Sequence, residues 1–380
     1  MVLFVALFVQ LNYLQVIKAD DYKNDPRNTR IAVRDFTQAR GQILAADGTV
    51  LAKSVPTKGA NFERLRQYPE TDLFAHVTGY FSFTYGSSGA EREFNDELAG
   101  RNLGISSLKD VLVNREVTGD VVLTVRKDLQ SVARAALGNR KGAVVALEPS
   151  TGGILALWSY PSFDPDLLSQ HNQQNVRNAW TLMNLATDKP MLPRAYRETY
   201  PPGSTFKVVT SAATLERKPE LATKSYPVLR ALDLPGTRTK LPNFGSEACG
   251  GTLPDLLRVS CNTGFGQMAM DLGAGALHDE AADWGFDSRP PIDLPAAERS
   301  VFPQASAFAH DQAGLAKSGI GQQDVRATPL QMASIAAGVA NGGVVMKPHV
   351  LRQVRDSDGN VVRTYEPSAW TTGTTPEVAG

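Results

Sequence analysis

Residues 198–210 read ETYPPGSTFKVVT, and this stretch decides how the chain is interpreted. Two prolines and a glycine precede Ser204 and an apolar run follows it, a pattern typical of a loop that leads into a helix. Lys207 stands three residues after Ser204, so both side chains are expected on one helix face. A serine hydroxyl attacks well only when a base takes its proton, and a lysine of lowered pKa can be that base. The stretch therefore predicts a serine nucleophile activated by a lysine.

The four-letter pattern Ser-x-x-Lys is weak without its surroundings. Ser106 and Lys109 match it as well, in SSLKD, but no Pro-Pro-Gly precedes them. We interpret that second copy as the surface of an ordinary loop or helix. The assignment of Ser204 rests on the residues around it.

A second polar cluster, Ser260-Cys261-Asn262, begins 56 residues after Ser204. A hydroxyl there can pass a proton between Lys207 and a leaving amine, and the amide can hold a substrate peptide group. Taken alone, so short a motif indicates only a polar loop or a helix cap. Beside Ser204 and Lys207, it is interpreted as the second element of one site.

Composition limits the classes of function. The chain has 380 residues, with 39 Lys plus Arg against 39 Asp plus Glu, so the formal net charge is zero. A nucleic-acid binder usually carries a basic surplus, which is absent here. Five His and two Cys show no zinc-site spacing, so we expect no metal site. Hydrophobic residues make up 42%, enough for a packed core in two or three domains.

The N-terminus is apolar from Val2 to Ile17 but carries polar residues such as Gln10 and Asn12. A bilayer span needs about 20 apolar residues, so this one is short. We expect residues 1–17 to be an uncleaved membrane anchor that leaves the rest of the chain outside the cytoplasm. The alternative is an amphipathic or buried helix.

Hairpins and a helix are expected further along. Asp47-Gly48 between apolar stretches predicts a hairpin, and residues 121–125 predict a strand. Residues 143–147 and 154–158 predict a second hairpin. Residues 128–137 predict a helix whose apolar face is formed by Leu129, Val132, Ala133 and Ala136. The expected division is an anchor over 1–17, a smaller domain over 18–140 that begins with a polar connector (18–40), and a main domain over 141–380.

Taken together, these segments resemble a known family. Ser-x-x-Lys followed by Ser-x-Asn is the order found in penicillin-binding proteins and β-lactamases. RGQILAADGTVLA (40–52) is similar to the opening of the pedestal of class B penicillin-binding proteins. The segments 142–165 and 319–343 are similar to the first strands of their transpeptidase domain and to the part after Ser-x-Asn. The short pedestal and the two cysteines are most like the actinobacterial type A members.

The resemblance implies an α+β transpeptidase fold, an antiparallel sheet flanked by helices, on a smaller N-terminal pedestal of dimerisation type. It implies a D,D-transpeptidase that cross-links peptidoglycan stem peptides during division and shape maintenance, and that β-lactams acylate. Ser204 would be the nucleophile, Lys207 the base, Ser260 the proton relay, and Asn262 a catalytic and substrate-binding amide. It implies no metal or organic cofactor, an extracytoplasmic catalytic domain, and a polytopic glycan polymerase as partner.

Two features depend on this resemblance. A disulfide between Cys249 and Cys261 is expected, the alternative being two separate thiols. The family also has a third motif, Lys-Ser/Thr-Gly, on a strand beyond a helix that would begin near Pro376. Lys317-Ser318-Gly319 has the right letters, but the residues after it resemble a loop that leads to a helix. We therefore expect residues 1–380 to end before the true motif, with Thr374 to Glu377 beginning that helix.

Three other functions remain open from the sequence. A transpeptidase domain that lacks its third motif could serve as a scaffold for a membrane glycan polymerase. A β-lactamase would need a deacylating water and base, and the pedestal is not expected of it. A penicillin-sensing receptor would need signalling segments that are not visible here.

Overall fold

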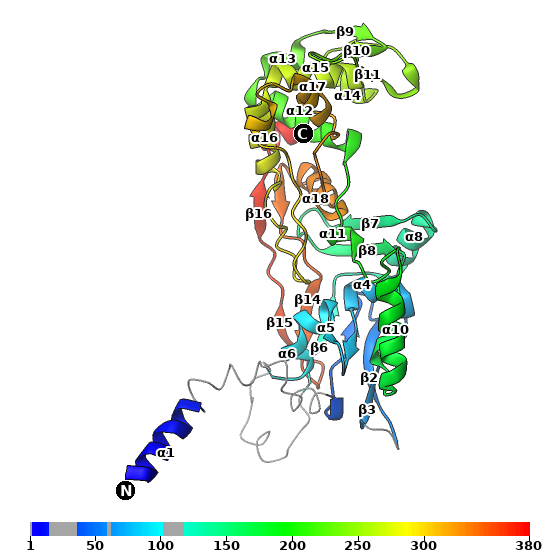
Figure 1. Ribbon diagram of the computed structural model, residues 1–380, viewed down its shortest axis with the longest axis vertical. Helices are drawn as coiled ribbons and strands as arrows, with labels where there is room; N and C mark the ends of the chain where they lie inside the picture. Colours follow the sequence, from blue (N-terminus) through cyan, green and yellow to red (C-terminus); the bar gives the residue numbers. More distant parts are fainter. Residues whose placement is uncertain (1, 15–35, 59–61, 102–117) are drawn as a thin grey trace.

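The computed structural model describes residues 2–14, 36–58, 62–101 and 118–380. The molecule is elongated: a six-stranded sheet lies toward one end, a group of helices forms the other, and a hairpin lies between them (Figure 1). Most of the expected connector and the second Ser-x-x-Lys copy fall outside the described residues.

The six-stranded sheet has the order β15-β14-β6-β1-β2-β3. Its strands are β1 (Ile43–Leu44), β2 (Val50–Pro56), β3 (Arg64–Gln67), β6 (Asp120–Leu123), β14 (Leu351–Arg355) and β15 (Val361–Thr364). The pairing of β1 with β6 is parallel and the others are antiparallel. The hairpin expected at Asp47-Gly48 is confirmed, with Gly48 at a φ of 84°. Two strands from the C-terminal part therefore complete a sheet that the N-terminal part begins.

The second expected hairpin is also confirmed, as β7 (Gly142–Leu147) paired with β8 (Ile154–Tyr160). Helices α8 (Lys127–Leu137), α11 (Arg194–Arg197) and α18 (Pro329–Ala340) contact it. No further strand is paired with β8 among the described residues, and a side chain of α8 binds part of its other edge. The Gln130 side chain accepts from the Leu157 N–H at 2.8 Å and donates to the Leu157 carbonyl at 3.1 Å.

These bonds also correct the expected face of α8. Gln130 is fully buried together with Ala133, whereas Val132 is 65% exposed and Ala136 is exposed. An apolar residue predicts burial reliably only where no nearby polar residue can satisfy buried backbone groups from the same position. Here Gln130 takes that position because it satisfies two backbone groups of β8 and donates to the Leu73 carbonyl at 2.8 Å.

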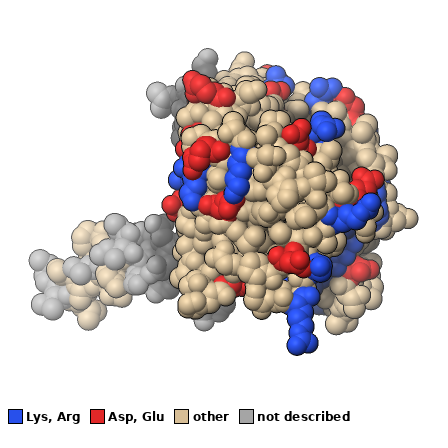
Figure 2. All heavy atoms as spheres, turned by 90° about the horizontal axis from the view of Figure 1, so that it is seen from above, with Lys and Arg blue, Asp and Glu red and all other residues tan. Residues whose placement is uncertain are grey.

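At the opposite end of the molecule, α12 packs against a core that contains Phe206, Phe265 and Trp284. Its helices are α12 (Lys207–Arg217), α13 (Glu220–Thr223), α14 (Leu253–Arg258), α15 (Asn262–Leu272), α16 (Ala274–Asp283) and α17 (Gln312–Ser318). Its strands form two-stranded antiparallel ladders: β9 (Tyr226–Leu229) with β12 (Cys249–Gly251), β10 (Ala231–Asp233) with β11 (Lys240–Pro242), and β13 (Val344–Met346) with β16 (Ala369–Thr372). Seen from this end, basic and acidic side chains are interspersed (Figure 2), as a net charge of zero allows.

Other helices and strands, of two to 13 residues, complete the described chain. They are α4 (Ala75–Thr78), β4 (Phe81–Ser82), β5 (Gly86–Ser87), α5 (Gly89–Glu93), α6 (Asn95–Leu98), α9 (Asp166–Ser169), α10 (Gln173–Leu185) and α19 (Pro376–Ala379). The N-terminal helix α1 (Val2–Asn12) exposes Leu3, Phe4 and Phe8. Within the described ranges, no helix has both the length and the apolar character to cross a bilayer.

Candidate active site

The predicted nucleophile lies where a loop becomes a helix. Ser204 belongs to a 3₁₀ turn, Gly203–Phe206, that continues directly into α12 at Lys207. Phe206 is fully buried and stacks on Phe302 with ring centroids 5.4 Å apart, which anchors the turn in the core. Ser204 itself is exposed, whereas Lys207 is only 1% exposed. The hydroxyl is thus open to a substrate and the amine is held beneath it.

Lys207 is the centre of the site. Its Nζ donates to Ser204 Oγ at 3.2 Å, to Ser260 Oγ at 2.9 Å and to Asn262 Oδ1 at 2.7 Å. Burial lowers the pKa of the Lys207 ammonium from its ordinary 10.5 to about 8. Desolvation disfavours the charged form, so a useful fraction of neutral amine is present near neutral pH. The structure therefore brings all four predicted catalytic residues together at one nitrogen.

The Ser260 and Asn262 side chains come from the turn between α14 and α15. Ser260 has a φ of 54°, an uncommon backbone conformation for a residue with a side chain. Asn262 opens α15, and its Nδ2 donates to the Pro242 carbonyl at 3.0 Å while Oδ1 accepts from Lys207. The amide orientation is thereby fixed by one contact on each end.

A disulfide joins Cys249 to Cys261, with the two Cα atoms 5.9 Å apart. Cys261 is buried, and in the sequence it stands between Ser260 and Asn262. The disulfide therefore links the turn that carries these two residues to β12. Asn243 braces the same turn from β11's side, because its Oδ1 accepts from the Thr263 N–H at 2.9 Å. No sequence signal pointed to this role, since Asn243 lies in an ordinary turn stretch, PNFG.

The segment that follows α17 packs against the 3₁₀ turn that carries Ser204, which we call the nucleophile turn. The Gly203 N–H donates to the Gly321 carbonyl at 2.9 Å, and Thr210 Oγ1 donates to the Gly319 carbonyl at 2.7 Å. Gly321 has a φ of 70°, and a Cβ there would collide with the Gly203 backbone and the Phe206 side chain. The Gly-x-Gly pattern at 319–321 is the one sequence signal from which this close approach could have been predicted.

A buried polar chain reaches the same loop from α11. Arg194 is fully buried, and its Nε lies 2.9 Å from Glu198 Oε2. The Tyr200 hydroxyl donates to the same Glu198 oxygen at 2.7 Å. Tyr200 also exchanges two backbone hydrogen bonds with Ala327. These contacts hold the residues that lead up to Ser204.

Lys317 lies near the end of α17, a helix, and so does not carry the strand motif that its tripeptide spells. The helix expected near Pro376 is present as α19. Its start is bound to α12, because Glu216 Oε1 accepts from Thr374 Oγ1 at 2.6 Å and from the Thr375 N–H at 2.7 Å. No strand in the described part of the chain carries Lys-Ser/Thr-Gly.

Comparison with known proteins identifies the family. Residues 142–376 match the penicillin binding protein transpeptidase domain, and residues 40–122 match the penicillin binding protein A dimerisation domain. The peptidoglycan D,D-transpeptidase PbpA of Mycolicibacterium smegmatis is 38% identical, over all of this chain and 78% of the relative. PbpA of Mycobacterium tuberculosis is 40% identical, over 94% of this chain and 74% of the relative.

Solved structures give the same result. Penicillin-binding protein A from M. tuberculosis, in its penicillin G acyl-enzyme complex, aligns with a TM-score of 0.83 and 38% identity. That alignment covers 90% of this chain and 80% of the other. The fold is thus a mixed α/β transpeptidase fold with an N-terminal domain of dimerisation type. The chain belongs to the penicillin-binding protein transpeptidase family.

Proposed function

We propose that this chain is a peptidoglycan D,D-transpeptidase that works through an acyl-enzyme on Ser204. The observation that carries the proposal is the buried Lys207 amine in contact with Ser204, Ser260 and Asn262. The acyl-enzyme complexes of the M. tuberculosis relative with penicillin G and ceftriaxone support covalent capture of β-lactams by this chain as well. No metal or cofactor is needed for this chemistry.

The proposed reaction has two halves. Neutral Lys207 takes the Ser204 proton as Oγ attacks the carbonyl of the penultimate D-Ala of a stem peptide. The carbon–nitrogen bond breaks, and the departing D-Ala amine receives the proton through the Ser260 hydroxyl. An amine of a neighbouring stem peptide then attacks the ester, gives up a proton by the reverse route, and releases Ser204. Asn262 positions the donor peptide with its amide.

The location and the partner of the protein are part of the same proposal. We place the catalytic domain, residues 141–380, on the extracytoplasmic side, above a pedestal over 18–140 and a membrane anchor over 1–17. The exposed apolar side chains of α1 support the anchor, and the disulfide suits an oxidising compartment. We also propose that the protein acts in cell division and cell shape, beside a polytopic glycan polymerase, as the family resemblance implies.

Covalent labelling by a fluorescent penicillin tests the proposal, on the protein expressed from its complete reading frame. Labelling should vanish in Ser204→Ala and persist in Ser106→Ala, which changes the serine of the other Ser-x-x-Lys copy. A folded protein that takes no label would overturn the enzyme proposal and favour the scaffold. Label that survives in Ser204→Ala would place the nucleophile elsewhere.

A further inference from the structure

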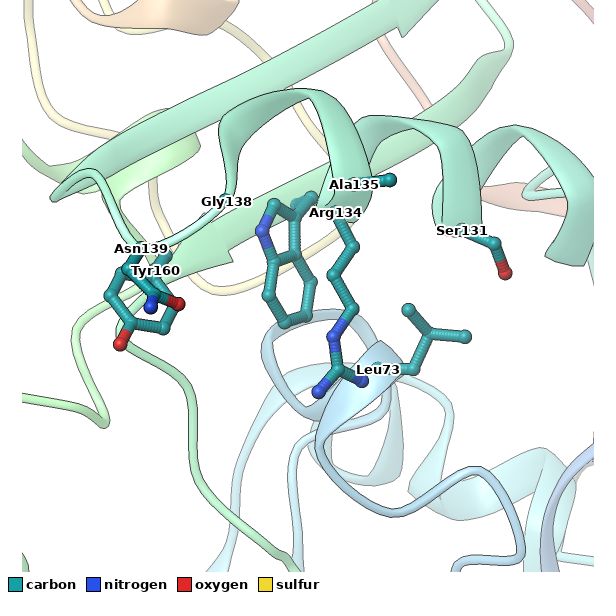
Figure 3. A pocket seen from close by; sticks show the side chains of 8 residues that line it. Leu73, Ser131, Arg134, Ala135, Gly138, Asn139 and Tyr160 are labelled. Carbon is teal, nitrogen blue, oxygen red and sulfur yellow. The ribbon is translucent and has the colours of Figure 1, made fainter.

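One pocket away from the catalytic residues lies beside α8, and its polar lining is already occupied by protein contacts. Figure 3 shows Arg134 running from α8 toward Leu73. The Arg134 guanidinium covers the Trp158 ring, 5.3 Å from its centroid, and Nη1 donates to Asp72 Oδ1 at 3.0 Å. The charge that lines this pocket is thus paired, and the ring beneath it is covered.

A second pocket, of about 180 Å³, lies where the two family-matched domains meet, and we call it the seam pocket. The N-terminal domain lines it with α4, Tyr80 and α5, and the transpeptidase domain lines it with Phe163, Trp180 and α11. Ligand sites occur preferentially at such interfaces, and those for drug-sized molecules measure about 300–1,000 Å³. The seam pocket is smaller, and its size suits a single large side chain.

Aromatic rings form the apolar wall of the seam pocket. Phe163 meets the His76 and Tyr80 rings edge to face, with centroids 5.6 and 6.4 Å apart. Trp180 meets Tyr80 in the same way at 6.0 Å and is stacked on Tyr85 at 4.1 Å. These contacts hold the rings in place, whereas Trp180 is only half-buried and keeps apolar surface open. A further aromatic ring packs well against such a wall, because aromatic pairs gain energy beyond the area that they bury.

The charge of the seam pocket is positive. Among the described residues, the charged side chains that line it are Arg92 on α5 and Arg197 on α11, both exposed, and no acidic residue lines it. Arg92 Nε lies 3.9 Å from Glu93 Oε1, too far for a hydrogen bond. The Arg197 side chain has no hydrogen-bond or ion-pair partner in the described part of the chain. His76 is neutral near pH 7, since burial lowers its pKa to about 4. The pocket therefore attracts carboxylates, which a guanidinium can bind through two parallel hydrogen bonds.

We propose that the seam pocket docks an acidic segment of a partner protein through one aromatic side chain. The ring of that side chain would pack against the aromatic wall, and the flanking carboxylates would bind Arg92 and Arg197. Because each matched domain supplies one of these arginines, the bound segment would bridge the two domains. The occupant is defined by the size of the pocket, its rings and its two available guanidinium groups.

Fluorescence anisotropy with a dye-labelled, capped Asp-Trp-Asp peptide tests this, on the protein expressed from its complete reading frame. Arg92→Gln and Arg197→Gln each remove one charge-assisted contact at an exposed position, so we expect affinity to fall about tenfold in each. Arg238→Gln changes an exposed arginine outside the pocket and should leave affinity unchanged. A peptide with alanine in place of tryptophan should also bind about tenfold more weakly, because it buries no ring.

Each outcome decides the proposal. An equal loss in Arg238→Gln would show non-specific attraction between charges, and equal affinity for the alanine peptide would show that no ring is bound. Either result would overturn the docking site, as would no binding by a protein that takes fluorescent penicillin. Indole-3-acetate that binds as tightly as the peptide would indicate a site for a small aromatic acid and would overturn it too. Peptide binding by a protein that takes no penicillin would support the docking site and count against the transpeptidase alone.

Discussion

Lys207 donates to both the hydroxyl and the backbone carbonyl of Ser260, at 2.9 and 2.7 Å, across 53 residues of sequence. The two bonds fix the nucleophile helix to the turn that carries the second motif. Because the same nitrogen also contacts Ser204 Oγ, a proton has a continuous route from Ser204 through Lys207 to Ser260. The first predictions concern this route.

Replacing the Lys207 amine should slow acylation. Lys207→Met removes the base but keeps an unbranched side chain of similar length, and a positioned base contributes about 10²–10⁴ in rate. We expect acylation by fluorescent penicillin to slow by about that factor. Lys317→Met, in the α17 tripeptide that only looks like a motif, is the matched control and should keep the full rate. Equal losses in the two variants would contradict the assignment.

Acylation should also depend on pH. The pKa of Lys207 is about 8 in the folded protein, and only the neutral amine can take the Ser204 proton. The rate constant for acylation should therefore rise as pH increases through about 8 and then level off. Stopped-flow or quenched labelling across pH 6 to 10 (a range of about two units either side) measures it. A flat profile would argue against Lys207 as the base.

The same pKa makes a prediction about stability. Burial lowers the pKa from 10.5 to about 8, so the unfolded chain binds more protons than the folded one between those values. The contribution of Lys207 to the free energy of unfolding should therefore increase with pH across this window. Denaturant unfolding of the wild type and Lys207→Met, compared at each pH, isolates that contribution. A difference that does not change between the two pH limits would contradict it.

We expect the Ser260 hydroxyl to be needed for catalysis, although the backbone conformation of this residue lowers stability. Ser260→Ala and Ser260→Gly both remove the hydroxyl, so both should lose about 10²-fold or more in transpeptidation. With φ at 54°, the glycine variant should be more stable than the alanine variant by about 1 kcal/mol. Ser246, at a φ of 58°, is the control: the same pair of substitutions should show that stability difference without the loss of activity.

The disulfide should support both the fold and the site. Replacing Cys249 and Cys261 together by alanine should lower the free energy of unfolding by about 2–4 kcal/mol. Acylation should also slow, because Cys261 holds the turn between Ser260 and Asn262. Dithiothreitol should affect the wild type in the same direction and leave the double variant unchanged. A wild type whose acylation ignores reduction would show that the turn needs no such support.

Gly321 should be intolerant of a side chain. Gly321→Ala places a Cβ against the Gly203 backbone, so we expect it to displace the Ser204 turn and slow acylation about tenfold or more, as small misplacements of catalytic groups do. Gly236→Ala is matched for backbone strain, with φ at 72° against 70°, but its Cβ would meet open space. Similar losses of stability in the two variants, with acylation slowed only in Gly321→Ala, would fit the contact. Normal acylation in Gly321→Ala would refute it.

What the sequence alone determined is local. The spacing of Ser204 and Lys207 places them one turn apart whatever the rest of the chain does, because helix geometry sets it. Asp47-Gly48 and the turn before Ile154 likewise predicted their hairpins, since short turns fix the pairing of the strands beside them. The family resemblance then added roles that no spacing supplies.

Only the tertiary structure decided which distant segments meet. It brought Asn262 to Lys207, set Asn243 and Gly321 behind the catalytic turns, and joined β14 to β6 in one sheet. It also buried Gln130 where periodicity had favoured Val132. Contacts between residues dozens of positions apart depend on how the whole chain packs and satisfies its buried polar groups. A local sequence pattern cannot predict such contacts.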